Sequence, residues 1–145
     1  MVNLMREILF RGKVESALNV DEWVYGFLVN ARSRFNGELR TYIQTIKENG
    51  ELDLLRAVDP ETVGQYTGLT DKNGTKIFEG DIVNVITETT RYVVKFDEWR
   101  CGWYPFASGD GCGCCEMHTY PPNYAEVIGN IHDNPELLKG DDYNA

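Results

Sequence analysis

The residues best suited to chemistry lie in one short segment of the C-terminal half. Three thiols and an imidazole fall within seven positions, in the run Gly111-Cys112-Gly113-Cys114-Cys115-Glu116-Met117-His118. Thiolates and imidazoles are ligands that zinc prefers, and a structural zinc site needs four ligands in a tetrahedron. The candidate metal ligands are therefore Cys112, Cys114, Cys115 and His118, and Cys101 is an outlying thiol that could join them.

The spacing of these thiols is not that of the common zinc sites. Two thiolates converge on one ion from a single turn when two residues separate them, as in Cys-x-x-Cys. Cys114 and Cys115 are adjacent and cannot easily ligate the same ion. We therefore expect a flexible insertion with reduced thiols and no cofactor, and we keep zinc binding as the alternative.

Nucleophilic catalysis would need a thiol or hydroxyl, a base and an orienting group. Cys114 and His118 offer the first two, but a pair on one loop lacks the rigid scaffold that holds catalytic groups in place. We therefore expect no enzymatic activity. A metal- or thiol-dependent enzyme that uses the Cys112–Cys115 loop is the alternative.

The elements that must position this loop are predicted to be strands. Between residues 23 and 28, the aromatic residues Trp23, Tyr25 and Phe27 alternate with Val24, Gly26 and Leu28. This alternation has the two-residue period of a pleated strand. Asn-Gly dipeptides at 36–37, 49–50 and 73–74 suit the positive φ angles of tight hairpin turns. The predicted strands are 23–30, 38–46, 51–58, 62–69, 76–87, 90–96, 102–106 and 124–130.

One short helix is predicted near the C-terminal end. Asn134 can cap its first turn, Pro135 suits the first helical position, and Glu136 favours the positive N-terminal end. Leu137 and Leu138 would then pack onto the sheet.

Three sequence blocks carry a resemblance to a known family. The most particular block, at residues 64–83, reads GQYTGLTDKNGTKIFEGDIV. The others are Met5–Lys13 with Trp23–Gly26, and Val127–Leu138. Together the blocks resemble the YopX-like family of phage and prophage proteins. The resemblance implies a small SH3-like barrel in the C-terminal portion, and it implies no known biochemical activity.

The sequence is therefore predicted to form a mainly β protein in two portions. Residues 1–63 would make an N-terminal portion rich in β-hairpins. Residues 64–145 would make a small antiparallel, barrel-like (SH3-like) portion ending in the short helix. A shift in composition near residues 60–64 marks the border, and the two portions together would form one YopX-like unit.

The charge of the protein bears on its partners. The net charge is −9, with eight Lys/Arg against ten Asp/Glu in residues 1–63, and six against thirteen in residues 64–145. Acidic surfaces repel phosphate backbones, because nucleic-acid affinity comes largely from Lys and Arg. Direct contact with nucleic acid is disfavoured. A nucleic-acid-related binder, or an acidic protein that mimics DNA toward a basic partner, is the alternative.

Two further patterns bear on the setting of the protein. No apolar run approaches the ~20 residues that span a bilayer, so no membrane partner is expected. The N-terminus lacks the pattern of a secretory signal. We expect a protein of the bacterial host's cytoplasm.

Aromatic residues cluster on both sides of the Cys-rich loop. Most should belong to the core, and a minority could form an exposed patch of the kind that interfaces favour. We therefore expect a non-enzymatic accessory module that binds a host or phage protein, or that assembles with itself. The cluster comprises Trp99, Trp103, Tyr104, Phe106, Tyr120 and Tyr124.

Overall fold

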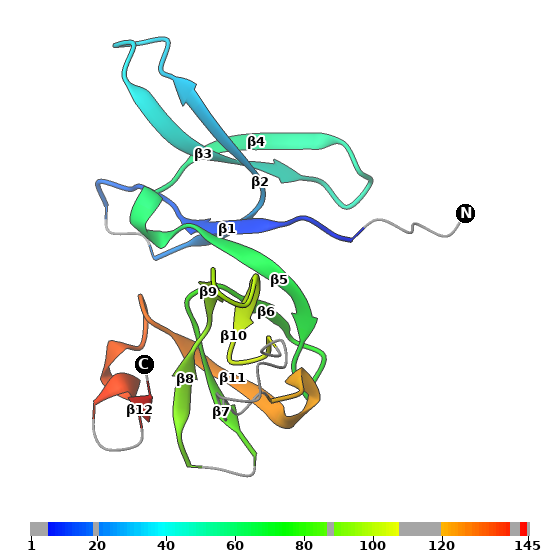
Figure 1. Cartoon of the computed structure of the whole chain (residues 1–145). Coiled ribbons are helices and arrows are strands. Elements are labelled where there is room, and N and C mark those ends of the chain that lie inside the picture. The colour runs from blue at the N-terminus through cyan, green and yellow to red at the C-terminus, as the bar shows by residue number, and fades with distance from the viewer. Residues whose placement is uncertain (1–5, 19–20, 87–88, 108–119, 140–142, 145) are drawn as a thin grey trace. The chain divides into compact units, whose positions relative to one another are not determined.

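The computed structural model describes residues 6–18, 21–86, 89–107 and 120–139, together with the backbone of residues 143–144. The chain divides into two compact units, residues 1–66 and 67–145, here called the first and second units. The predicted border, after residue 63, lies slightly earlier in the sequence. Both units consist mainly of antiparallel strands, so the predicted mainly β fold is confirmed (Figure 1).

The strands of the first unit hydrogen-bond in the order β4-β3-β2-β1-β5. The predicted hairpins at Asn36-Gly37 and Asn49-Gly50 are both present, and both glycines adopt positive φ angles. The strand β1 was not predicted. The elements are β1 (Phe10–Lys13), β2 (Trp23–Arg32), β3 (Leu39–Ile46), β4 (Leu52–Ala57), the 3-10 turn η1 (Pro60–Thr62) and the start of β5 (Gly64–Thr70).

The long strand β2 changes its partner at Gly26. Its residues 23–26 pair with β1 and its residues 27–32 pair with β3. A Cβ at Gly26 would lie 2.0 Å from the carbonyl oxygen of Gln44, so only glycine allows this close approach. The side of the sheet that Val24 and Gly26 face, here called the inner side, holds a buried cluster of Val24, Ile43 and Val58.

The outer edge of this sheet is irregular. The β3–β4 register shifts between Gln44 and Ile46, which marks a β-bulge. The Thr45 hydroxyl occupies the bulge, where it accepts the N–H of Leu54 and donates to the carbonyl oxygen of Leu54, both at 3.1 Å. The bulge is thus held by a side chain of the neighbouring strand.

The second unit contains a four-stranded sheet in the order β11-β7-β8-β12 and a separate pair, β10-β9. The β8–β12 pair is parallel and β7 is antiparallel to both β8 and β11. The remaining elements are β6 (Lys76–Phe78), β7 (Asp81–Val85), β8 (Arg91–Val93), β9 (Lys95–Asp97), β10 (Gly102–Tyr104), η2 (Pro122–Tyr124), β11 (Ala125–Asn130), η3 (Pro135–Leu138) and β12 (Tyr143–Asn144).

The sheets of the second unit do not close into a barrel in the part of the chain that the structure describes, so the predicted barrel-like closure needs correction. The predicted strand 76–87 is broken by a turn at Gly80, whose φ is +89°. Asp81 holds this turn by accepting the N–H of Phe78 at 2.8 Å. The predicted strand 90–96 is likewise split into β8 and β9. These breaks leave β9 and β10 as a hairpin of their own.

The predicted C-terminal helix is a 3-10 turn, η3, and not an α-helix. Asn134 makes no capping bond to this turn, because its side-chain oxygen accepts the N–H of Asn130 at 3.3 Å instead. Without that cap the segment forms a single turn. Within the described ranges, no helix has the length and apolar character needed to cross a membrane.

The core of the second unit lies on its four-stranded sheet. Phe106 and Tyr120, which lie outside the strands, are among the partly buried side chains that pack against it. Its buried cluster comprises Ile77, Val83, Val85, Tyr92, Val94 and Ala125.

Candidate functional site

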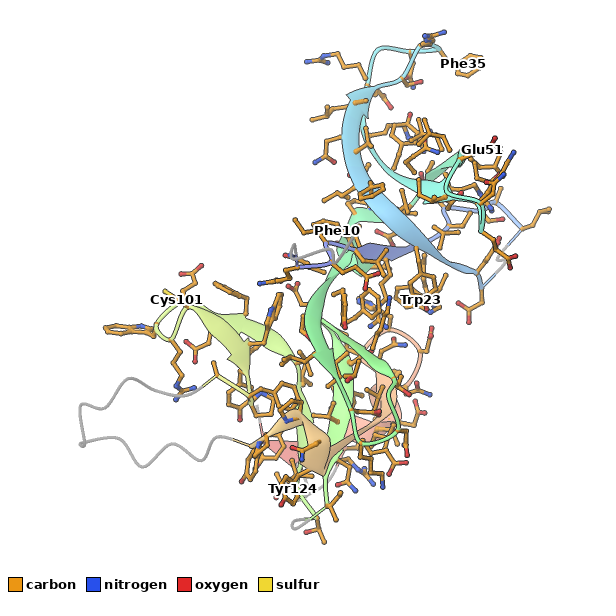
Figure 2. All side chains as sticks on the ribbon, turned by 90° about the vertical axis from the view of Figure 1, so that its right-hand side faces the viewer. Phe10, Trp23, Phe35, Glu51, Cys101 and Tyr124 are labelled. Atoms are coloured by element: carbon orange, nitrogen blue, oxygen red, sulfur yellow. The ribbon has the colours of Figure 1, made fainter. Side chains whose placement is uncertain are left out.

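The feature of the second unit best suited to recognition is the β9–β10 hairpin. Asp97 pairs with Gly102, Phe96 with Trp103 and Lys95 with Tyr104. The turn between the strands consists of residues 98–101, and Cys101 lies at that end of the hairpin (Figure 2). The hairpin therefore projects a four-residue turn from a two-stranded sheet.

The turn is fixed by the carboxylate of Asp97. One oxygen accepts the N–H of Trp99 at 3.0 Å and the N–H of Arg100 at 3.3 Å. The other accepts Nη1 of Arg100 at 2.8 Å, in an ion pair whose side chains are 20% and 9% exposed. Asp is suited to this role because its short side chain reaches the amides two and three residues ahead.

Two further features complete the turn. Cys101 adopts a φ of 50°, in the left-handed region that non-glycine residues seldom occupy. Its thiol donates to the carbonyl oxygen of Glu98 at 3.5 Å, a distance within the criterion for sulfur. Trp99 stands on this fixed backbone with 97% of its surface exposed.

The strands below the turn are lined by aromatic side chains. Phe96 and Trp103 pack edge to face across the hairpin, with ring centroids 5.3 Å apart. The ammonium of Lys95 lies over the ring of Tyr104 at 5.3 Å. Trp103 and Tyr104 also pack against the core, whereas Phe96 is half exposed.

The predicted aromatic cluster is thus divided by the fold. Trp103, Tyr104, Phe106 and Tyr120 pack against the core, and the hydroxyl of Tyr120 lies 3.2 Å from that of Tyr92. Tyr124 is about half exposed, Trp99 is almost fully exposed, and Phe96, which the prediction did not include, is also half exposed.

A shallow hollow of about 370 Å³ adjoins the hairpin. This volume is near the lower end of the range for ligand sites, about 300–1,000 Å³. Its walls combine apolar side chains with the Arg100 side chain, whose charge is met by Asp97. The lining residues are Thr67, Leu69, Arg100, Cys101, Gly102, Trp103, Phe106 and Ala107.

The hairpin carries no net charge. Between residues 95 and 104, Lys95 and Arg100 balance Asp97 and Glu98, although residues 64–145 as a whole are strongly acidic. The site therefore presents aromatic surface without the repulsion that the rest of the unit exerts on acidic partners.

The buried carboxylates of the second unit serve the fold. Asp71 accepts the N–H groups of Asn73, Thr75 and Val127, each at 2.9 Å. Burial raises the pKa of Asp71, but these three bonds and nearby Lys72 outweigh it and place the pKa below its usual value. Partial burial raises the pKa of Glu79.

The predicted metal ligands Cys112, Cys114, Cys115 and His118 lie outside the described residues, so zinc binding stays a prediction. Of the four cysteines in the sequence, Cys101 is described, and it is free and exposed. Among the described side chains, no group of three or more His, Cys, Asp or Glu is placed to hold a metal ion.

Sequence reasoning missed part of this site. Phe96 was assigned to a strand but not to the aromatic patch, and its pairing with Trp103 becomes visible only once the register is known. Thr67 and Leu69 line the hollow from β5, about thirty residues away in sequence. No local pattern signals such a contact, because the fold alone brings these segments together.

Comparison with known proteins adds a family and a fold. A family model described as YopX protein matches residues 17–139. Among solved structures the chain is similar to "Crystal structure of protein EF1440 from Enterococcus faecalis", with 24% identity and a TM-score of 0.51. That match covers 93% of this chain and 100% of the other, and at this identity it concerns the fold alone. No curated protein matches the chain.

Proposed function

The chain belongs to the YopX family, and from that premise we propose that it is a non-enzymatic accessory protein that binds another protein through the β9–β10 hairpin. The proposal places the protein in the cytoplasm of a bacterial host, as a product of phage or prophage origin. Its partner is a host or phage protein.

The observation that carries this proposal is the exposure of Trp99 on an ordered turn. Tryptophan is enriched among the few residues that dominate binding energy at protein interfaces. The Asp97 bonds fix the backbone on which Trp99 stands, so little backbone entropy remains to be lost on binding. An exposed anchor that is already ordered is a feature expected of a recognition surface.

The surroundings of Trp99 indicate the kind of partner. The hollow and half-exposed Phe96 offer apolar surface, and the charges of the hairpin cancel. These features favour an apolar protein surface over a nucleic acid, whose binding requires an excess of Lys and Arg. We expect the affinity to depend weakly on salt concentration.

A pull-down from bacterial host lysate tests the proposal. The bait is the tagged full chain, compared with Trp99→Ala and with Phe35→Ala, and each capture is run with and without nuclease. Phe35 is the matched control, because it is a fully exposed aromatic residue at the turn of the β2–β3 hairpin (Figure 2). We expect one partner that survives nuclease, is lost with Trp99→Ala and is kept with Phe35→Ala.

Two outcomes would contradict the proposal. A partner that disappears with nuclease would support the nucleic-acid-related alternative. A partner that Trp99→Ala captures as well as the wild type does would show that the hairpin is not the binding surface. The thiol- or metal-dependent alternative depends on Cys112–Cys115, and a triple Cys112/Cys114/Cys115 variant addresses it separately.

A further inference from the structure

Three asparagines of the chain are followed by glycine, and all three lie in exposed turns between strands. The dipeptides are Asn36-Gly37, Asn49-Gly50 and Asn73-Gly74. A Cβ built at any of these glycines would meet no described atom within 4 Å beyond the adjoining residues, so the turns are open to water. Every other asparagine precedes a residue with a side chain, which crowds the peptide nitrogen. Glycine leaves that nitrogen accessible and its backbone free to rotate.

The side chains of Asn36 and Asn49 fold over the peptide of the glycine that follows. The Oδ1 atom of Asn36 accepts the N–H of Glu38 at 3.1 Å, and that of Asn49 accepts the N–H of Glu51 at 3.0 Å. A bond from a side-chain oxygen to the amide two residues ahead requires the side chain to turn back over the intervening peptide. The side-chain carbonyl carbon, Cγ, is thereby brought toward the glycine nitrogen.

The same hydrogen bond prepares the side-chain carbonyl for attack. A nucleophile that adds to Cγ moves negative charge onto Oδ1. A donor that is already directed at this oxygen stabilises the charge as it develops, and a nitrogen and carbon held close together need little further ordering before they react. Both turns therefore combine a nucleophile, a nearby carbonyl carbon and a donor at its oxygen.

We propose that Asn36 and Asn49 are sites of spontaneous chemical modification through a succinimide. The glycine nitrogen loses its proton and bonds to Cγ, the bond from Cγ to Nδ2 breaks, and Nδ2 leaves as ammonia. Water then opens the cyclic imide. Cleavage between the glycine nitrogen and Cγ gives aspartate, and cleavage between that nitrogen and the main-chain carbonyl carbon gives isoaspartate. Each event consumes a water molecule and releases an ammonia molecule.

Asn73 is the internal comparison, because its side chain is engaged elsewhere. Its Nδ2 donates to Oε1 of Glu126 in β11 at 3.4 Å, and Glu126 is itself paired with Lys72 at 3.0 Å. Within the part of the chain that the structure describes, no donor is directed at the Oδ1 atom of Asn73. The glycine N–H groups do not distinguish the three sites, since each donates to a carbonyl oxygen of its own turn at 2.9 or 3.0 Å.

Modification alters both hairpins of the first unit. Isoaspartate adds a methylene to the main chain inside a turn, and the length of that turn sets the register of the strands on either side. Each event also adds one negative charge to a chain whose net charge is already −9. Neither turn belongs to the β9–β10 hairpin, so this inference is independent of the function proposed above.

Peptide mapping of the full chain by mass spectrometry tests the proposal. The protein is incubated at mildly alkaline pH, either folded or unfolded in urea, and the formation of aspartate and isoaspartate is followed at Asn36, Asn49 and Asn73. The rate in the folded chain is divided by the rate in urea at the same site, which removes the effect of the neighbouring residues. This quotient is here called the folded-to-urea ratio.

We expect the folded-to-urea ratio to be about tenfold higher at Asn36 and Asn49 than at Asn73, a smaller factor than the ~10²–10³ that a donor to the oxyanion contributes in a rigid enzyme site. A ratio at Asn73 that equals or exceeds the other two would overturn the proposal. So would a folded protein in which Asn36 and Asn49 stay unchanged while the sample in urea reacts.

Glu38→Pro tests the hydrogen bond itself, because proline removes the N–H that Asn36 accepts. Glu38→Ala is the matched control, since it loses the same charge and keeps the N–H. The folded-to-urea ratio at Asn36 should fall by about tenfold in Glu38→Pro alone, and the ratio at Asn49 should keep its wild-type value in both variants. Equal ratios at Asn36 in the two variants would contradict the proposal. If circular dichroism shows that Glu38→Pro is unfolded, the wild-type comparison with Asn73 decides the question.

Discussion

Gly26 is the residue at which β2 changes its partner from β1 to β3, and it lies against the backbone of β3. A Cβ at this position would lie 2.0 Å from the backbone oxygen of Gln44 and 2.8 Å from its carbonyl carbon. Both are backbone atoms, so no side chain can turn aside to make room. Relief would require β2 and β3 to separate at the place where they begin to pair.

Gly26→Ala should therefore lower the free energy of unfolding by about 1–3 kcal/mol or more, as overpacking does. Urea unfolding followed by circular dichroism measures this loss. Gly12→Ala is the graded control, because its Cβ would lie 3.1 Å from the side chain of Val58, which can shift slightly. Equal stability of the Gly26→Ala and wild-type proteins would show that the close approach of β2 and β3 does not need glycine.

Asp71 gives a second prediction at the residue scale. Its folded pKa lies below its unfolded value, so the ionised carboxylate contributes stability above about pH 4. That contribution is lost as the pH falls through the folded pKa. Asp71→Asn should cost about 1–3 kcal/mol at pH 7, because an amide has only one oxygen to accept three N–H groups.

The measurement is urea unfolding of Asp71→Asn and the wild type between pH 7 and pH 3. The gap between them should narrow as the pH falls below about 4. Both proteins contain Glu79, whose raised pKa makes its ionised form less stable in the folded state. The difference between their free energies of unfolding therefore reports on Asp71 alone. A gap that is independent of pH would contradict the role assigned to the Asp71 carboxylate.

For individual residues, the sequence predicts that side chains alternate between the two faces of a strand, but not which set faces the core. The alternation along β2 is present, yet its larger aromatic residues Tyr25 and Phe27 face outward, while Val24 and Gly26 face the core. Size and hydrophobicity favour the opposite arrangement. The close approach of β2 and β3 at Gly26 explains part of this orientation, because no side chain fits at that position on the side that Val24 faces.

At the scale of elements, the β9–β10 turn should matter to binding through its rigidity. Asp97→Ala removes the acceptor of two backbone N–H groups and the partner of Arg100, but leaves Trp99 in place. The released turn must then be ordered when the partner binds, which costs about 1–2 kcal/mol and lowers affinity about 5- to 30-fold.

Titration of the captured partner against Asp97→Ala measures this loss. Glu98→Ala is the control, because it also removes one negative charge and alters no side-chain hydrogen bond described for the turn. Affinity should fall with Asp97→Ala and stay near the wild-type value with Glu98→Ala. Equal losses in both variants would indicate that charge, and not the order of the turn, governs binding.

Hairpins were the most predictable elements and short strands the least. Asn-Gly located the β2–β3 and β3–β4 turns, although in each of them only the glycine adopts a positive φ. The asparagine side chains hold these turns by accepting the N–H groups of Glu38 and Glu51. The strand β1 escaped prediction because its Phe10-Arg11-Gly12-Lys13 sequence places a buried arginine beside a glycine. Arg11 is accommodated by stacking on Trp23, a tertiary contact with no local signal.

At the scale of the whole molecule, the two units should differ in their resistance to opening. Among the residues that the structure describes, the buried cluster of the second unit has six members and that of the first unit has three. Local opening requires less energy where fewer apolar contacts must separate. The amides of β7 should therefore exchange with solvent more slowly than those of β3 at low protein concentration.

Native-state hydrogen exchange resolved by peptide measures this difference. Ile82 and Val83 report on the second unit, and Ile43 reports on the first, since all three are fully buried. Equal exchange in both regions would indicate that the chain opens as one cooperative body.

The bulge in β4 bears on how the protein behaves when it is abundant. A strand that pairs with an exposed edge needs backbone N–H and C=O groups at the regular spacing of a β-ladder. A bulge at the edge interrupts that spacing. In β4 the hydroxyl of Thr45 holds the irregularity in place through the backbone of Leu54. Copies of the sheet that meet at this edge cannot continue one another's ladder. Crowding of the chain should therefore yield discrete particles in place of fibrils.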